Sequence, residues 1–158
     1  MDNYTAFNFW ANKRLVNWLK VQSEHLLQQE FPSSYPSILK TLNHIWGVEE
    51  FWFSIITETV DYKNRFDAAD FISSEIFDGL LARSHILSET VKVYSDEEII
   101  KLIKPTDPDL QRELPRYEFL QHLVNHSSYH RGQVITIARG VGIANAPMTD
   151  YNVYHDPV

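Results

Sequence analysis

Apolar side chains recur with helical spacing in four long segments of the chain. Within each segment they lie three or four residues apart, which places them on one face of an α-helix. These helices are expected to begin at Asp2 or Thr5, Ser34 or Ser37, Asp70 and Pro115, and to end near Gln29, Thr59, Tyr94 and Arg139. Four such helices, each about 30 to 37 Å long, predict an all-α four-helix bundle, formed by a single domain over residues 1–158.

Polar and proline-rich stretches separate the four helical segments. Residues 31–36 contain two prolines, and proline ends helices. Residues 61–69 are polar and read as a loop. Residues 95–98 have the sequence of a helix N-terminus, which predicts a short helix to Ile103, followed by turns. Residues 141–158 are expected to form an irregular tail that covers one end of the bundle.

Composition and charge restrict the classes of partner. The chain has 158 residues with 44% hydrophobic side chains and a formal net charge of −7. Binding to phosphate backbones requires concentrated positive charge, so we expect no nucleic-acid partner. There is no cysteine, which excludes disulfides and a cysteine nucleophile. Neither a signal peptide nor a membrane span is expected, so a cytoplasmic location without membrane partners is the default.

Three histidines repeat every four residues in the last helical segment, at His122, His126 and His130. A step of four residues turns an α-helix by about 400°, so the three rings form one stripe. Apolar neighbours such as Phe119 and Leu123 continue the stripe, which directs it inward. Buried imidazoles need partners. The spacing is therefore compatible with a divalent metal site. The alternative is three separate polar residues on a solvated face, and the apolar neighbours argue against it.

The segment Asn125–Gln133 reads N-H-x-x-x-H-R-G-Q and resembles the signature of the DinB-like family of metalloenzymes. Residues 9–15, FWANKRL, are similar to the pattern of that family's first helix. Residues 42–45, LNHI, followed by Glu49 and Trp52, are similar to the pattern of its second helix. The resemblance covers nearly the whole chain, but only the two histidine segments are specific.

The resemblance implies a metal site and a helix order. In that family one histidine of the second helix and the H-x-x-x-H pair of the fourth bind a divalent metal, which corresponds to His44, His126 and His130. His122 would then adjoin the ligands or act as a lid. The helices would follow the up-down-down-up order of the family.

Three histidine ligands would leave an open coordination position, as catalytic metal sites do. All-nitrogen ligation favours zinc or nickel, with iron or copper as alternatives, and disfavours magnesium and calcium. The resulting candidates are a hydrolase and a thiol-dependent S-transferase, since the wider superfamily contains transferases that use low-molecular-weight thiols. A non-catalytic metal-binding stress-response module is the alternative, with its fourth position closed by His122 or Asp150. The sequence does not identify the substrate.

Other polar residues receive structural interpretations from the sequence. Glu49 follows His44 by five residues, about 140° round the helix, so the two cannot share a metal. Glu49 is therefore interpreted as structural or surface, and Glu118 as solvated. Asn8 and Asn12 lie one turn apart and are interpreted as surface or capping residues, with a pocket-facing position as the alternative. His85 is expected at the surface.

The first three helices carry more large apolar residues than one inward face can hold. Among them are Phe51, Phe53, Phe71 and Phe77. Apolar residues left outside the core favour association, so a homodimer is expected.

Overall fold

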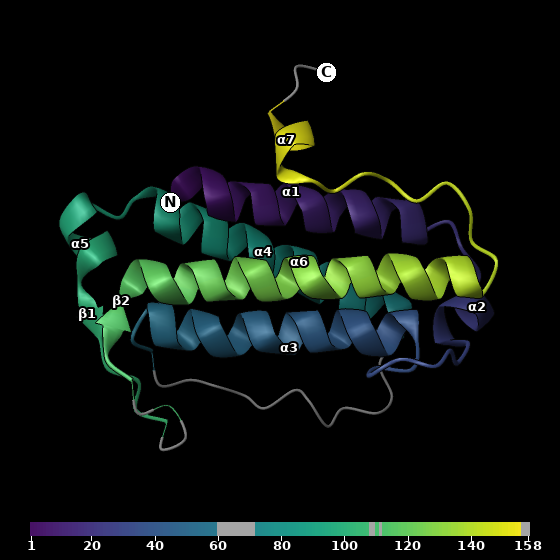
Figure 1. The fold of residues 1–158 in the computed structure, drawn as a ribbon, viewed down its shortest axis with the longest axis horizontal. Helices are drawn as coiled ribbons and strands as arrows, with labels where there is room; N and C mark the ends of the chain where they lie inside the picture. Colours follow the sequence, from purple (N-terminus) through teal and green to yellow (C-terminus); the bar gives the residue numbers. More distant parts are fainter. Residues whose placement is uncertain (60–71, 108–109, 111, 156–158) are drawn as a thin grey trace.

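Four long helices dominate the structure (Figure 1), a computed structural model that describes residues 1–59, 72–107, 110 and 112–155. They are α1 (Asp2–Leu19), α3 (Ile38–Ile56), α4 (Ser73–Lys92) and α6 (Arg116–Gly140). The shorter elements are α2 (Glu24–Gln28), α5 (Asp96–Ile100), β1 (Leu102–Ile103), β2 (Leu114–Pro115) and α7 (Tyr151–Tyr154). The predicted all-α bundle is confirmed.

Helices α1 and α6 run in one direction, and α3 and α4 run in the other (Figure 1). Near its start, α1 lies beside α6, because Tyr4 Oη donates to Asn125 Oδ1 over 2.8 Å. Near its end, α1 contacts the segment that follows α6, because Trp18 Nε1 donates to the carbonyl of Ala144 over 3.0 Å. This is the up-down-down-up order that the resemblance implies.

The prediction of one continuous helix to Gln29 was wrong. Helix α1 ends at Leu19, and α2 starts in a new direction after Ser23, whose hydroxyl accepts a hydrogen bond from the Leu26 amide. This change of direction buries Leu27, which is 1% exposed. The start of α3 matches the prediction, because Ser37 caps it by accepting from the Lys40 amide at 3.1 Å.

The short helix after Ser95 forms as predicted but is shorter. Ser95 and Glu98 bond reciprocally in a capping box, and the helix ends at Ile100 rather than Ile103. The next residues were not expected to form a strand. They do so because β1 pairs with β2, with Leu102 opposite Pro115 in an antiparallel register.

Helix α6 ends in a Schellman motif centred on Gly142. The Gly142 amide donates to the carbonyl of Arg139, and the Ile143 amide donates to that of Ala138. Gly142 has φ of +92°, a conformation that glycine adopts without strain. The tail then returns along α1, where α7 packs Tyr154 against Trp10 with ring centroids 5.6 Å apart. It covers the side of α1 instead of a bundle end.

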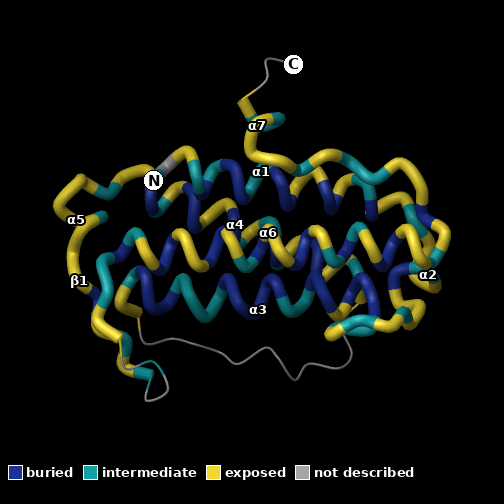
Figure 2. The backbone as a smooth tube through the Cα atoms, in the orientation of Figure 1, coloured by how far each residue is buried: buried dark blue, intermediate teal, exposed yellow. Residues whose placement is uncertain are grey.

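The long helices turn their buried residues toward one another (Figure 2). Phe77 belongs to this core, Phe51 and Phe53 are half-buried, and Phe71 lies outside the described residues. A side chain at Gly79 would overlap the ring of Trp46, so this glycine permits the close contact of α4 with α3. Among the described helices, none is both long and apolar enough to cross a membrane.

Candidate metal centre

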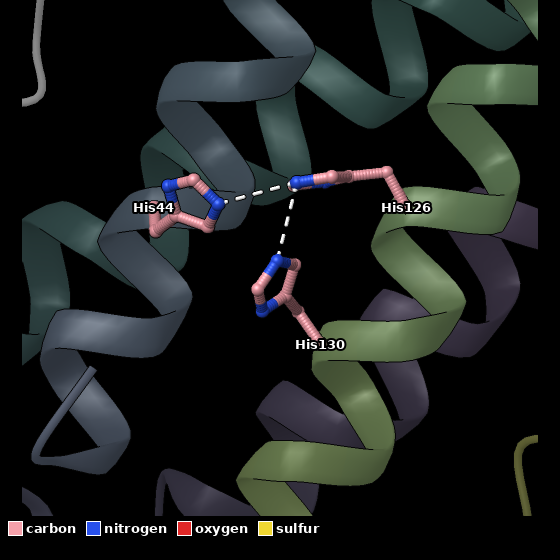
Figure 3. Close-up of side chains that lie close together, drawn as sticks. All are labelled: His44, His126 and His130. Atoms are coloured by element: carbon pink, nitrogen blue, oxygen red, sulfur yellow. Dashed lines mark hydrogen bonds between the residues drawn. The ribbon is translucent and has the colours of Figure 1, made fainter. Parts of the chain in front are cut away.

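The packing of α3 against α6 brings three histidines together. His44 projects from α3 and His126 and His130 from α6, with their rings directed at one another (Figure 3). His126 Nε2 lies 3.2 Å from His44 Nε2 and 3.1 Å from His130 Nε2. One ring nitrogen from each residue falls within 4.8 Å of the others. The local spacing of four residues and the long-range helix contact thus produce one cluster.

The surroundings keep these imidazoles neutral. Burial, followed by the proximity of His130, lowers the pKa of His44 to about 4. Burial lowers the pKa of His126 to about 3, together with the neighbouring imidazoles of His130, His44 and His122. Burial also lowers the pKa of His130, although its hydrogen bond to Gln133 acts to raise it. A metal binds the neutral form of histidine, so the site needs no deprotonation at neutral pH.

His130 is oriented by a partner on its second ring nitrogen. Its Nδ1 lies 2.7 Å from Gln133 Oε1, and Gln133 Nε2 bonds in turn to Ser33 Oγ. Because Oε1 accepts, the proton resides on Nδ1 and the Nε2 lone pair faces the cluster. Such outer hydrogen bonds are typical of metal-bound histidines. Among the described residues no equivalent partner is found for His126 Nδ1.

The donor set fits a cation. A single proton on His126 Nε2 can bond well to only one of its two neighbours, which leaves another pair of ring nitrogens facing each other. A divalent ion would interact favourably with all three lone pairs. The number and type of donors match a three-nitrogen site for a transition metal.

Aromatic rings flank the cluster on two sides. The ring of Tyr35 stacks on His44 with centroids 4.0 Å apart and an interplanar angle of 19°. His122 is exposed and packs against Trp52, with centroids 4.6 Å apart. Its ring centroid is 6.1 Å from that of His126, and it is not a member of the three-histidine group. His122 therefore adjoins the site without completing it.

The remaining candidates lie away from the cluster. Asp150 borders a cavity of about 570 Å³ between α6, α1 and the tail, together with Arg139 and Gly132. Glu118 and His85 are exposed, as expected. Among the described residues, no carboxylate belongs to the three-histidine group.

A second polar cluster, which we call the Glu49–Arg131 network, was not predicted. Glu49 is fully buried; Ser127, Asn8 and Asn12 donate to its Oε1, and Ser84 donates to its Oε2. Arg131 is 1% exposed and donates from Nη1 to Asn8 Oδ1 at 2.7 Å and to Asn12 Oδ1 at 2.9 Å. Each asparagine therefore bridges the carboxylate and the guanidinium. The interpretation of the two asparagines as surface or capping residues was wrong, because they satisfy this buried pair.

The network combines two buried groups of opposite charge. Burial raises the pKa of Glu49, whereas its hydrogen-bond donors and Arg131 lower it. Burial lowers the pKa of Arg131 to about 10, so the guanidinium stays protonated at neutral pH. The i, i+4 spacing of Asn8 and Asn12 in α1 was a signal for a shared inward face. Their partners, on α3, α4 and α6, had no such local signal.

Comparison with known proteins agrees with the fold and with the family resemblance of the sequence. A family model described as the DinB family matches residues 1–158. The chain belongs to the DinB family. Protein DinB of Bacillus subtilis (strain 168) is 27% identical to it over 157 residues, which cover 94% of this chain and 89% of that protein. A DinB-like protein from Bacillus cereus ATCC 10987, known from a crystal structure, matches with a TM-score of 0.72 and 19% identity over 88% of this chain and 90% of that one. The latter likeness concerns the fold alone.

Proposed function

We propose that this DinB-family protein binds one divalent transition metal through the Nε2 atoms of His44, His126 and His130. The observation that carries this proposal is the convergence of the three nitrogens within 4.8 Å. Zinc and nickel suit the all-nitrogen donor set best, with iron or copper as alternatives. When bound, such an ion supplies Lewis acidity, which promotes loss of a proton from water or from a thiol.

We further propose that the protein is a metal-dependent enzyme. A structural site would use a fourth protein ligand, whereas a catalytic site keeps a position open. His122 packs on Trp52, and Asp150 borders the cavity on the other side of α6, so neither belongs to the histidine group. This arrangement favours catalysis over the alternative, a non-catalytic metal-binding stress-response module.

Thiol-dependent S-transfer is the favoured reaction and hydrolysis is the second candidate. Hydrolysis requires a base to accept a proton, and no carboxylate among the described residues belongs to the histidine group. Transfer from a thiol needs no such base once the sulfur has lost its proton. Since the chain has no cysteine, the thiol would be an external low-molecular-weight compound. The residues of this chain would hold the ion, and the rings of Tyr35, Trp52 and His122 would form walls beside it.

Metal analysis and an activity screen test this proposal together. Purified protein is stripped with a chelator and titrated with zinc and nickel, and one ion per chain is expected. The loaded protein is then assayed with pairs of thiols and electrophiles and, separately, with simple esters. Thiol consumption that depends on metal supports transfer, and ester cleavage without thiol supports hydrolysis. One bound ion without either activity would favour the non-catalytic alternative, and no bound ion would refute the whole proposal.

Predictions about partners rest on other features. The homodimer remains a prediction. It was based on large apolar residues left outside the core, and the burial of Phe77 weakens that argument. Light scattering that shows a monomer at tens of micromolar would refute it. The net charge of −7 still argues against nucleic-acid binding. A submicromolar complex with DNA or RNA at physiological salt would contradict that prediction.

A further inference from the structure

The two helices that carry the candidate ligands also carry the Glu49–Arg131 network. On α6, Ser127 directly follows His126, and Arg131 directly follows His130. Adjacent residues point about 100° apart on a helix, so α6 presents its histidines on one face and its network residues on the next. From that second face Ser127 reaches Glu49 of α3, and Arg131 reaches Asn8 and Asn12 of α1. On α3, Glu49 lies about 140° round from His44. Each helix is therefore tied to the network beside its ligands.

The network makes directional contacts among all four long helices. Glu49 of α3 accepts from Ser127 of α6 at 3.1 Å and from Ser84 of α4 at 2.6 Å. Arg131 of α6 reaches Asn8 and Asn12 of α1, which donate back to Glu49. Hydrogen bonds of this kind depend on angle as well as distance, whereas the hydrophobic effect is non-directional. The bonds of Ser127 and Arg131 thus restrain the rotation of α6 about its own axis.

A metal site is sensitive to this rotation. The ends of side chains lie about 5–6 Å from a helix axis, so a turn of about 10° moves a ring nitrogen by about 1 Å. Metal–ligand distances vary by only about 0.2 Å in well-formed sites. A buried charged pair seldom stabilises a fold more than apolar residues of the same size would. Its directional bonds, by contrast, can hold α3 and α6 within the tolerance that the ligands need.

We infer that Arg131 and Glu49, with Asn8, Asn12 and Ser127, are positioning residues that set the geometry of the three-histidine site. The inference rests on the proposed metal binding by His44, His126 and His130. It assigns to the buried network a role in metal affinity and coordination geometry in addition to its contribution to stability. Arg131 and Glu49 act through the helices and not by touching the ion.

Cobalt(II) is the probe, because its visible absorption depends on coordination geometry. Arg131→Met is expected to weaken cobalt binding by about tenfold, the lower end of the roughly 10- to 100-fold range for residues that support metal ligands, and to change the absorption. Ser127→Ala removes a single bond to Glu49 and should cost about threefold to tenfold. Gln133→Ala serves as a reference for this range of affinity loss, because Gln133 forms a hydrogen bond with the proposed ligand His130 itself.

Arg116→Met is the matched control. Arg116 lies on the same helix, is 5% exposed, and donates to the carbonyls of Ile56 and Glu98 and to Glu58. It lies ten residues before His126, about 15 Å along the helix. The control should lose stability as Arg131→Met does but keep the affinity and spectrum of the wild type. For Ser127→Ala the corresponding control is Ser54→Ala, a buried serine of α3 that donates to the carbonyl of Phe51.

The outcomes separate the two proposals. Wild-type protein that binds no cobalt refutes the proposed metal site itself. If the wild type binds cobalt and both Arg131→Met and Ser127→Ala retain its affinity and spectrum, only the positioning inference is wrong. It is also wrong if Arg116→Met weakens cobalt binding as much as Arg131→Met does. Should Arg131→Met fail to fold, the comparison of Ser127→Ala with Ser54→Ala decides.

Discussion

The histidine cluster and the Glu49–Arg131 network occupy neighbouring faces of the same two helices. They differ in how far their hydrogen-bond donors and acceptors are paired with one another. In the network, four side-chain donors converge on the Glu49 carboxylate, and both asparagines connect it to Arg131. In the cluster, three Nε2 atoms converge, and one proton on His126 Nε2 can satisfy only one of the two contacts between them. A region whose donors and acceptors match is complete within the protein. A region with an excess of acceptors has the donor set that a cation could use.

Breaking the network should have the largest effect on stability. Glu49→Ala leaves Arg131 buried without its carboxylate, and loss of one partner of a buried pair costs about 3–5 kcal/mol in unfolding free energy. For a domain of this size that lowers the thermal midpoint by about 6–20 °C. Thermal unfolding followed by circular dichroism measures the shift.

The adjacent glutamate is the control for that experiment. Glu50 pairs with Arg83 at 2.6 Å but is partly exposed, and such pairs contribute about 0–1 kcal/mol. Glu50→Ala should therefore lower the midpoint by no more than about 4 °C. Equal shifts of the thermal midpoint in the two variants would mean that the buried contacts of Glu49 contribute no more to stability than the partly exposed pair of Glu50.

Removing one ligand should abolish most metal binding with a smaller effect on the apoprotein. Loss of a residue that supports a ligand costs about 10- to 100-fold in affinity, so loss of His44, His126 or His130 should exceed 100-fold. His122→Ala should have a milder effect, and His85→Ala, on α4, should have none. Competition titrations with a chromophoric chelator give the dissociation constants. Wild-type affinity in His126→Ala and His130→Ala would refute the central claim about the cluster.

Metal removal should destabilise the wild type. An ion that bridges α3 and α6 in the folded state adds about 2.7 kcal/mol at a free concentration 100 times its dissociation constant. A chelator should accordingly lower the thermal midpoint by about 5–11 °C. In His126→Ala the chelator should change nothing. A metal-independent midpoint in the wild type, with binding demonstrated, would show that the ion does not link the helices.

A further expected effect is a dependence of apoprotein stability on pH. In the unfolded chain histidine has a pKa of about 6.5, whereas burial lowers the pKa to about 4 for His44 and about 3 for His126. Below pH 6.5 the unfolded state therefore binds more protons, and stability falls as the pH drops toward 4. Denaturant titrations of the chelator-treated protein at pH 7, 6 and 5 measure this loss.

His126→Asn isolates the contribution of the cluster to that pH dependence. The raised pKa of Glu49 acts in the opposite direction, because a raised pKa lets the folded state bind the proton first. Both proteins contain Glu49, so the difference between them reports the histidine. A stability profile as steep in His126→Asn as in the wild type would contradict the lowered pKa of His126.

Local features of the sequence determined the helices, the caps at Ser37 and Ser95, and the stripe that contains His126 and His130. These depend on residues a few positions apart, where the geometry of one helix is sufficient. His44 could be added only through the resemblance to the DinB-like family, because no local rule links it to α6. The end of α1 at Leu19 was not predicted. The break in the helix allows Leu27 to be buried, and that burial depends on tertiary packing, which the local sequence does not contain.

Only the tertiary structure decided which polar residues of different helices face one another. The sequence identified no partner for Asn8, Asn12 or Glu49, and it assigned Arg131 no role. A buried hydrogen bond can be inferred from a sequence only when its partner is known. The strands β1 and β2 could not be predicted for the same reason, because each two-residue strand forms only by pairing with the other. Spacing along one helix determined which side chains share a face. The packing of helix on helix determined whether that face meets solvent, a counter-charge or two further imidazoles.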